Sequence, residues 1–162
     1  TTREFGWLMK HMGIDFLNLQ PEEPDNPIGS SSGAGVIFGA TGGVTEAALR
    51  TAYWMLFDEE LPDDGIDFYE TRGIDGVREA WLDLKGNKVH IAIASGLGSA
   101  NKLLDRLRAG EEFHWIEIMG CPGGCIGGGG QPYAGANAIP LDKEALRKRA
   151  SEVWRRSGSP TS

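Results

Sequence analysis

Apolar residues recur with a helical period in three stretches of the chain. The opening stretch, TTREFGWLMKHMG, predicts a short helix that Thr1 or Thr2 caps and Gly13 ends, with Glu4 in its first turn. Four of its apolar residues fall at helical spacing, and we expect them to face the core: Phe5, Leu8, Met9 and Met12. A charged helix is predicted near residues 142–155.

The other helical stretch lies within residues 35–57. It begins with a short apolar run, continues through a glycine-rich turn and becomes a helix. Six positions of this helix form an expected buried stripe: Val44, Ala47, Ala48, Thr51, Met55 and Leu56. Residues 20–35 hold three prolines followed by serines and glycines, and they predict a long loop. Loops of this length are often functional in a compact domain.

A period of two residues predicts strands in the middle of the chain. DFYETRG (67–73) predicts one strand. In WLDL (81–84) the two leucines alternate with Trp81 and Asp83, and the apolar run VHIAIA (89–94) follows shortly afterwards. Gly86-Asn87 between them predicts the tight turn of a β-hairpin.

The pattern then predicts a strand (88–94), a glycine turn, a helix (about 99–109) and a second strand (113–119). This order is that of a βαβ unit with a parallel strand pair. The predicted fold class is therefore α/β, a parallel or mixed sheet lobe flanked by helices. Ligands of open α/β sheets bind beyond the carboxyl ends of the strands, and Cys121 stands two residues past such an end.

Composition narrows the possible partners. The 162 residues are most simply one domain, with a net charge of −7 and a pI near 5.0, which argues against nucleic acid and acidic membrane surfaces as partners. The sequence has neither a run long enough for a membrane span nor the layout of a signal peptide, so we expect a cytoplasmic protein. It also lacks an initiator methionine, so we expect it to begin inside a longer reading frame or after processing.

Glycine accounts for 24 residues, about twice its usual share, and it clusters around the two cysteines in WIEIMGCPGGCIGGGGQPY (115–133). Three interpretations of the pair rest on spacing alone. Cys121 and Cys125 could form a disulfide or a buried pair, or a redox dithiol, although that chemistry normally uses Cys-x-x-Cys. They could also bind zinc with one or more of three histidines, although structural zinc sites usually have a second close pair of ligands. These histidines are His11, His90 and His114.

A fourth interpretation, an iron–sulfur ligand pair, also accounts for the glycines. A metal–sulfur cluster is bulky and anionic, and glycine lets the backbone approach it closely and offer N–H groups to its sulfurs. A 4Fe–4S cluster held by cysteines needs four thiolates, and this chain has two.

The motif EIMGCPGGCIGGGGQP (117–132) closely resembles the last cluster-binding motif of the FeFe hydrogenases. SGAGVIFGATGGVTEAALR (32–50) resembles a second signature of the same catalytic domain. TTRE (1–4) and RGIDGVREA (72–80) also fall in the expected order, and the similarity extends to about residue 150. The resemblance implies one part of a two-lobed catalytic domain that reversibly reduces protons to hydrogen.

The resemblance also implies roles for single residues. Cys121 matches the cysteine that ligates only the 4Fe–4S subcluster of the H-cluster, and Cys125 matches the cysteine that bridges this subcluster to the two-iron centre. Met119 matches a residue lining the pocket of the two-iron centre, and Phe38 and Gly39 match residues packing beside its carbon monoxide and cyanide ligands. Apart from the metal ligands, no catalytic residue is identified.

Two earlier cysteine motifs of the family, its proton-relay cysteine and a cyanide-contacting lysine have no counterpart here. We therefore interpret residues 1–155 as the second half of the catalytic domain, inactive alone, and residues 156–162 as a flexible tail. The implied partners are the missing N-terminal half, in the same or a separate chain, and ferredoxin or a nicotinamide-linked subunit. The alternatives are an iron–sulfur relative in assembly or sensing, and a split, truncated or degenerate hydrogenase.

Overall fold

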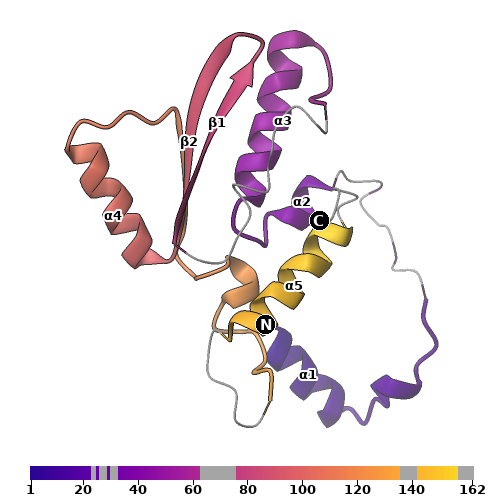
Figure 1. Ribbon diagram of the computed structural model, residues 1–162. Coiled ribbons are helices and arrows are strands. Elements are labelled where there is room, and N and C mark those ends of the chain that lie inside the picture. Colours follow the sequence, from indigo (N-terminus) through magenta and orange to yellow (C-terminus); the bar gives the residue numbers. More distant parts are fainter. Residues whose placement is uncertain (23–24, 26–28, 30–32, 63–75, 136–141, 157–162) are drawn as a thin grey trace.

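The computed structural model describes residues 1–22, 25, 29, 33–62, 76–135 and 142–156. The expected strand at 67–73, the end of the chain after Arg156 and part of the expected loop at 20–35 lie outside these residues. The helices are α1 (Thr2–His11), η1 (Phe16–Asn18), α2 (Ala34–Ile37), α3 (Gly43–Phe57), α4 (Leu97–Arg108), η3 (Cys125–Gly127) and α5 (Lys143–Arg156) (Figure 1). The strands are β1 (Val77–Leu84), β2 (Asn87–Ser95) and β3 (Trp115–Met119).

The three strands form one mixed sheet in the order β1-β2-β3. β1 pairs antiparallel with β2, and β2 pairs parallel with β3 across α4, which confirms the predicted βαβ unit. The hairpin turn is Lys85-Gly86 and not the expected Gly86-Asn87, because Asn87 already pairs with Leu84. Both turn residues have positive φ (52° and 91°), the conformation whose twist matches that of the flanking strands.

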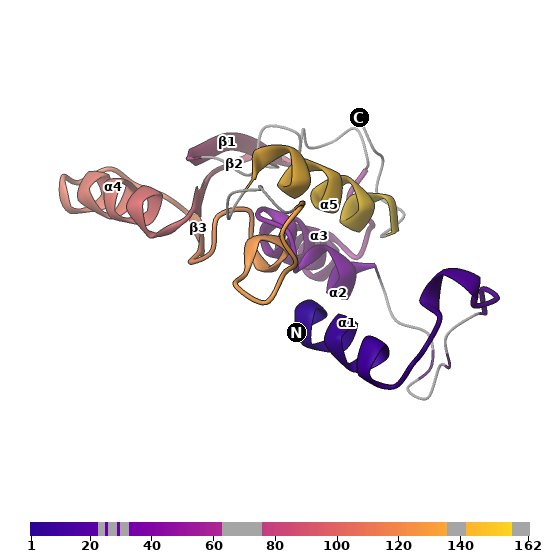
Figure 2. The same cartoon turned by 90° about the horizontal axis from the view of Figure 1, so that it is seen from below.

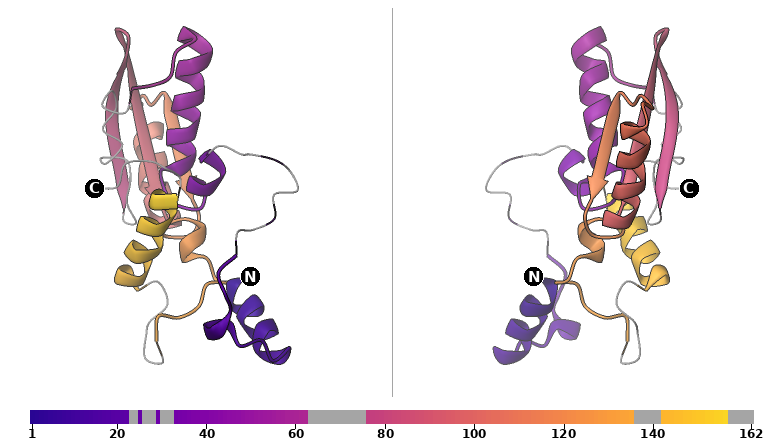
Figure 3. Two further views of the ribbon diagram at one scale, coloured as in Figure 1. Left: turned by 90° about the vertical axis from the view of Figure 1, so that its right-hand side faces the viewer. Right: turned by 90° about the vertical axis from the view of Figure 1, so that its left-hand side faces the viewer.

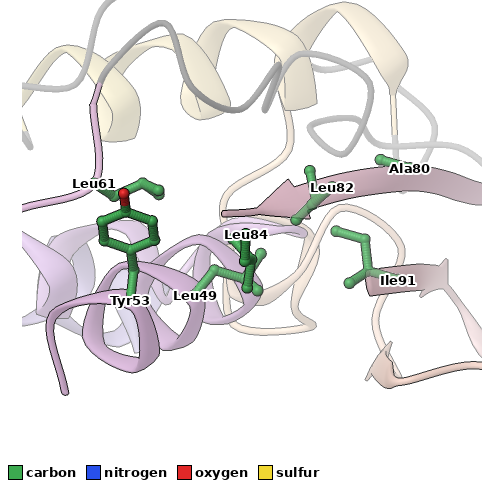
Figure 4. Packing of buried hydrophobic residues seen from close by; sticks show 7 residues of the cluster. All are labelled: Leu49, Tyr53, Leu61, Ala80, Leu82, Leu84 and Ile91. Carbon is green, nitrogen blue, oxygen red and sulfur yellow. The ribbon is translucent and has the colours of Figure 1, made fainter. Parts of the chain in front are cut away.

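Helices cover both faces of this sheet. Ala80, Leu82, Leu84 and Ile91 pack with Leu49 and Tyr53 of α3 and with Leu61 (Figure 4). On the opposite face, Ala92 and Ala94 pack with Ala100 and Leu103 of α4. Successive residues of a strand point to opposite faces, so the sheet lies between α3 and α4 (Figures 1 and 3).

A separate cluster attaches the C-terminal helix to the cysteine-containing loop. Its buried members come from α2, α3, η3 and α5 and the turn after α2: Ile37, Ala40, Ala47, Ile126, Leu146 and Trp154. The predicted charged helix is therefore confirmed as α5, which packs beside the loop after β3.

The expected buried faces of two helices were wrong. α1 begins at its Thr1 cap as predicted, but it has no buried residue, and Phe5, Leu8 and Met12 are exposed. Figure 2 shows α1 lying away from the sheet. In α3 only Ala47 of the expected stripe is buried, whereas Thr51, Met55 and Leu56 are exposed. The buried positions of α3 instead include Thr45, Leu49 and Tyr53, one turn apart, because this row faces the sheet. None of the described helices is long and apolar enough to cross a membrane.

Candidate metal centre

The two cysteines lie in the loop that follows β3. β3 ends at Met119, whose carbonyl accepts a hydrogen bond from the Gly96 N–H at 2.8 Å, and Cys121 follows two residues later, as predicted. Cys121 and Cys125 are both exposed free thiols. The interpretation as a buried cysteine pair is therefore wrong, and both sulfurs are accessible to an incoming ligand.

Glycines shape this loop between the two sulfurs. Gly123 and Gly124 have φ values of 82° and 90°, which side chains disfavour, and the Gly124 N–H donates to the Cys121 carbonyl at 2.9 Å. A Cβ at Gly124 would lie 2.8 Å from the Gly39 carbonyl oxygen. A Cβ at Gly127 would lie 2.0 Å from the Pro122 carbonyl oxygen. These glycines are therefore needed for close contacts between backbone segments of the chain, whether or not a cluster is bound.

The glycine turn after α2 lies directly against the cysteine loop. The Thr41 N–H donates to the Gly123 carbonyl at 3.1 Å, and the Ile126 N–H donates to the Gly39 carbonyl at 3.2 Å. These two backbone hydrogen bonds connect the two motifs on which the sequence resemblance rests. They bring Gly39 beside the loop that carries Cys121 and Cys125.

Phe38 directly precedes Gly39, and Met119 ends β3 two residues before Cys121. The Phe38 side chain is 47% exposed, although a phenylalanine in an apolar run would ordinarily be part of the core. Met119 is half-buried at the end of β3. The structure therefore gathers the segments that hold all five predicted site residues.

Sequence reasoning missed Glu117, a buried carboxylate in β3. Its Oε1 accepts a hydrogen bond from the Gly42 N–H at 2.7 Å. Its Oε2 accepts from the Thr45 N–H at 2.8 Å and from the Thr45 hydroxyl at 2.7 Å. The available signal was an acidic residue within an otherwise apolar strand, because a buried charge requires partners.

Three side chains hold the cysteine loop, from β2, from α5 and from the segment that follows η3. The Ser95 hydroxyl accepts a hydrogen bond from the Gly123 N–H at 2.9 Å. The Gln131 amide donates to the Cys125 carbonyl at 3.3 Å, and the Arg149 guanidinium of α5 donates to the Ile126 carbonyl at 2.9 Å. Gln131 thus supports the loop at the carbonyl of Cys125.

A cavity of about 340 Å³ opens beside Cys121. It is lined by the glycine run 127–129, by Tyr133 and by Leu146 and Arg149 of α5. Arg3 connects the first helix to the same region, because its backbone N–H donates to the Gly130 carbonyl at 3.1 Å and its guanidinium donates to the Gly129 carbonyl at 2.6 Å. The opening TTRE motif therefore fixes α1 next to the glycine run.

The three histidines have other contacts. His90 stacks on Trp81, with ring centroids 4.2 Å apart, and its backbone N–H donates to the His114 ring at 3.0 Å. His11 stacks on Trp7 of α1. Within the part of the chain that the structure describes, no group of three or more His, Cys, Asp or Glu side chains could hold a metal ion. The zinc interpretation therefore finds no ligand set there.

The donor set fits part of an iron–sulfur cluster. Two exposed thiols stand four residues apart on a loop whose backbone is fixed at Gly123, Gly124 and Ile126 by hydrogen bonds. Thiolates are the ordinary ligands of 4Fe–4S clusters, and such a cluster takes four of them. Two thiols on one loop are the kind of ligand that such a cluster takes.

Comparisons with known proteins agree with this chemistry. The family model described as "Iron only hydrogenase large subunit, C-terminal domain" matches residues 1–129. NADP-reducing hydrogenase subunit HndD from Solidesulfovibrio fructosivorans is 51% identical over 154 residues, which are 95% of this chain and 25% of that protein. Iron hydrogenase 1 from Clostridium pasteurianum is 41% identical over 156 residues, 95% of this chain and 26% of that protein. The chain thus spans about a quarter of the length of these curated relatives.

Solved structures show the same similarity. The [FeFe]-hydrogenase HydA1 from Chlamydomonas reinhardtii superimposes with a TM-score of 0.67 at 35% sequence identity, covering 98% of this chain and 45% of that chain. Protein NAR1 from Arabidopsis thaliana, a relative with a different name, is 31% identical over 136 residues, 81% of this chain and 28% of that protein.

Proposed function

Because this chain belongs to the family of iron-only hydrogenase large subunits, we propose that it forms the second half of a catalytic domain that reversibly reduces protons to hydrogen. The observation that carries this proposal is the pair of hydrogen bonds joining Thr41 to Gly123 and Ile126 to Gly39. They unite the two motifs of the resemblance in one site, where each would have to contribute to a single cofactor.

The proposed roles follow from position. By the resemblance, Cys121 and Cys125 would supply two thiolates to a 4Fe–4S cluster, and the Cys125 sulfur would also hold the two-iron centre. When bound, that centre supplies the redox chemistry of hydrogen. Phe38, Gly39 and Met119 would line the pocket of that centre and limit the access of water.

We infer that the other two thiolates come from the N-terminal half of the catalytic domain, in the same or a separate chain. The exposed stripe of Phe5, Leu8 and Met12 on α1 is a surface that such a half could cover. Electrons would come from ferredoxin or a nicotinamide-linked subunit. The isolated chain is inactive under this proposal, because half of the ligand set is missing.

A second candidate, an iron–sulfur protein that acts in cluster assembly, is supported by the similarity to Cytosolic Fe-S cluster assembly factor narfl from Xenopus tropicalis, which is 31% identical over 136 residues. The intact glycine turn after Phe38 and the glycine run after Cys125 favour the hydrogenase, because a protein without a two-iron centre has no such centre to enclose. The higher identity to HndD points the same way.

The test uses the complete, anaerobically matured protein. We expect Cys121→Ala to lower the iron content and weaken the electron paramagnetic signal of the cluster, and Cys125→Ala to abolish hydrogen evolution from a reduced dye as well. Ser151→Ala, an exposed change in α5, is the control and should leave all three readouts unchanged. Full iron and full activity in both cysteine variants would refute the ligand assignment. A wild-type protein with a 4Fe–4S signal but no hydrogen evolution would favour the second candidate.

A further inference from the structure

We propose that Glu117 is a positioning residue. It sets the position of the turn between α2 and α3 (residues 38–42, called the Phe38–Gly39 turn below) relative to the cysteine loop. The importance of this role for a cofactor rests on the proposed function. The hydrogen bonds from which we infer it do not depend on any cofactor. Glu117 is 6% exposed, and a carboxylate buried to this extent requires partners for its charge. Its partners all belong to the turn and the first residues of α3.

α3 begins at a residue that cannot cap it. Gly42 is the N-cap residue, has a φ of 91° and offers no side chain to the exposed N–H groups of the first turn. Glu117 supplies the missing cap from a strand 75 residues further along the chain. A carboxylate at a helix N-terminus is also favoured by the helix dipole. The cap of α3 is therefore a long-range contact between the turn and β3.

β3 contains Glu117, and the cysteine loop begins directly after β3. Glu117 stands two residues before Met119 and four before Cys121. The orientation of the anchor is fixed in turn, because the Thr45 hydroxyl donates to Glu117 and accepts from the Trp115 indole N–H at 3.0 Å. Glu117 thus connects the Phe38–Gly39 turn to the strand from which the cysteine loop starts.

Within the described part of the chain, the buried hydroxyl of the turn gives it no further anchor. Thr41 is 2% exposed, and its hydroxyl has no hydrogen-bond partner among the residues that the structure describes. The turn meets the cysteine loop through the backbone of Gly39 and Thr41, whose partners are Ile126 and Gly123. Loosening the Glu117 anchor should therefore loosen this backbone junction as well.

The first test is hydrogen–deuterium exchange of the complete protein, which requires no cofactor. In Glu117→Gln the new NH₂ group must face a backbone N–H, so at least one hydrogen bond is lost. We expect exchange to become about tenfold faster or more in peptides covering 38–47 and 120–128, but not in the hairpin 77–95. Glu79→Gln, the same chemical change elsewhere in the sheet, is the control. Unchanged exchange in 120–128, or equal acceleration of the hairpin, would overturn the proposal.

Two less disruptive variants keep the proposal testable if Glu117→Gln fails to fold. They also allow a spectroscopic measurement. Thr45→Ser keeps the hydroxyl that bonds to Glu117, and Thr45→Val removes it at nearly the same volume. In the matured protein we expect shifted or broadened infrared bands of the diatomic iron ligands in Thr45→Val and Glu117→Gln, with wild-type bands in Thr45→Ser. Identical spectra in all variants would refute the positioning role while leaving the proposed function intact. If wild-type protein has no such bands, the proposed function fails and the exchange experiment alone decides the role of Glu117.

Discussion

The amide of Thr41 donates a hydrogen bond to the carbonyl oxygen of Gly123, 3.1 Å away. The two residues belong to different glycine-rich motifs, yet this contact and its neighbour from Ile126 to Gly39 place the motifs in one site. Gly124 is at the point of closest approach, because even one carbon added to it would touch the Gly39 carbonyl. The stability of the site therefore depends on glycines for steric reasons.

Gly124→Ala should destabilise the protein strongly. The new Cβ would lie 2.8 Å from the Gly39 oxygen, at a residue whose φ of 90° already disfavours a side chain. We expect a loss of about 2–4 kcal/mol in the free energy of unfolding, measured by urea denaturation. Gly129→Ala is the matched control, since nothing lies within 4 Å of its added Cβ, and it should change stability by less than about 0.5 kcal/mol. Equal stabilities of the two variants would contradict the close approach of the loops.

The two thiols should be open to chemical labelling in the isolated chain. Both cysteines are exposed and free, so we expect iodoacetamide to alkylate both under anaerobic conditions, as counted by mass spectrometry. In the matured complete protein the same thiols should be protected, because each would be bound to iron. Labelling at the same rate in both preparations would be evidence against a cluster at this loop. After aerobic purification, a Cys121–Cys125 disulfide is the expected competing product.

Local sequence patterns correctly predicted the secondary structure that positions the cysteine loop. The βαβ unit and the position of Cys121 just after β3 follow from apolar periodicity over short segments, and the structure confirms both. The roles of Cys121 and Cys125 came from the resemblance, since spacing alone left disulfide, zinc and redox interpretations open.

Features that depend on distant contacts could not be predicted in this way. α1 has apolar residues at helical spacing, yet none of them is buried against the part of the chain that the structure describes. The cap of α3 comes from Glu117, 75 residues away, so no local motif marks it. In α3, alanine, threonine and methionine occupy several faces, and periodicity could not select the row of Leu49 and Tyr53 that meets the sheet.

An ion-pair network between Glu79 of β1, Arg106 of α4 and Glu111 should make stability depend on pH. Arg106 binds both Glu79 and Glu111, and its hydrogen bond to Glu79 is the main cause that holds the pKa of Glu79 below its ordinary value. Because the folded pKa is the lower one, this stabilisation is complete above the unfolded pKa of the carboxyl group. It is lost as the pH falls through the folded pKa.

Glu79→Gln should therefore cost about 1 kcal/mol or less at neutral pH, since the pair is partly exposed, and the cost should shrink as the solution becomes acidic. Urea unfolding of wild type and variant over this acidic range measures the difference. Glu112→Gln, at a neighbouring exposed carboxylate, controls for net charge. If the difference in the free energy of unfolding between wild type and Glu79→Gln stayed constant with pH, the Glu79 ion pair would not contribute to the pH dependence of stability.

The exposed stripe on α1 should bind the rest of the catalytic domain. Phe5, Leu8 and Met12 are 59%, 44% and 65% exposed and follow helical spacing, so they form one apolar face. We expect the double change Leu8→Ser with Met12→Ser to alter the stability of the isolated chain by less than about 1 kcal/mol, because neither side chain is buried there. The same change should weaken association with a separately expressed N-terminal half by at least about tenfold, as burial of both side chains is lost. Titration calorimetry of the two halves measures this, with Lys10→Ser on the same helix as the control. An unchanged dissociation constant would place the interface elsewhere on the chain.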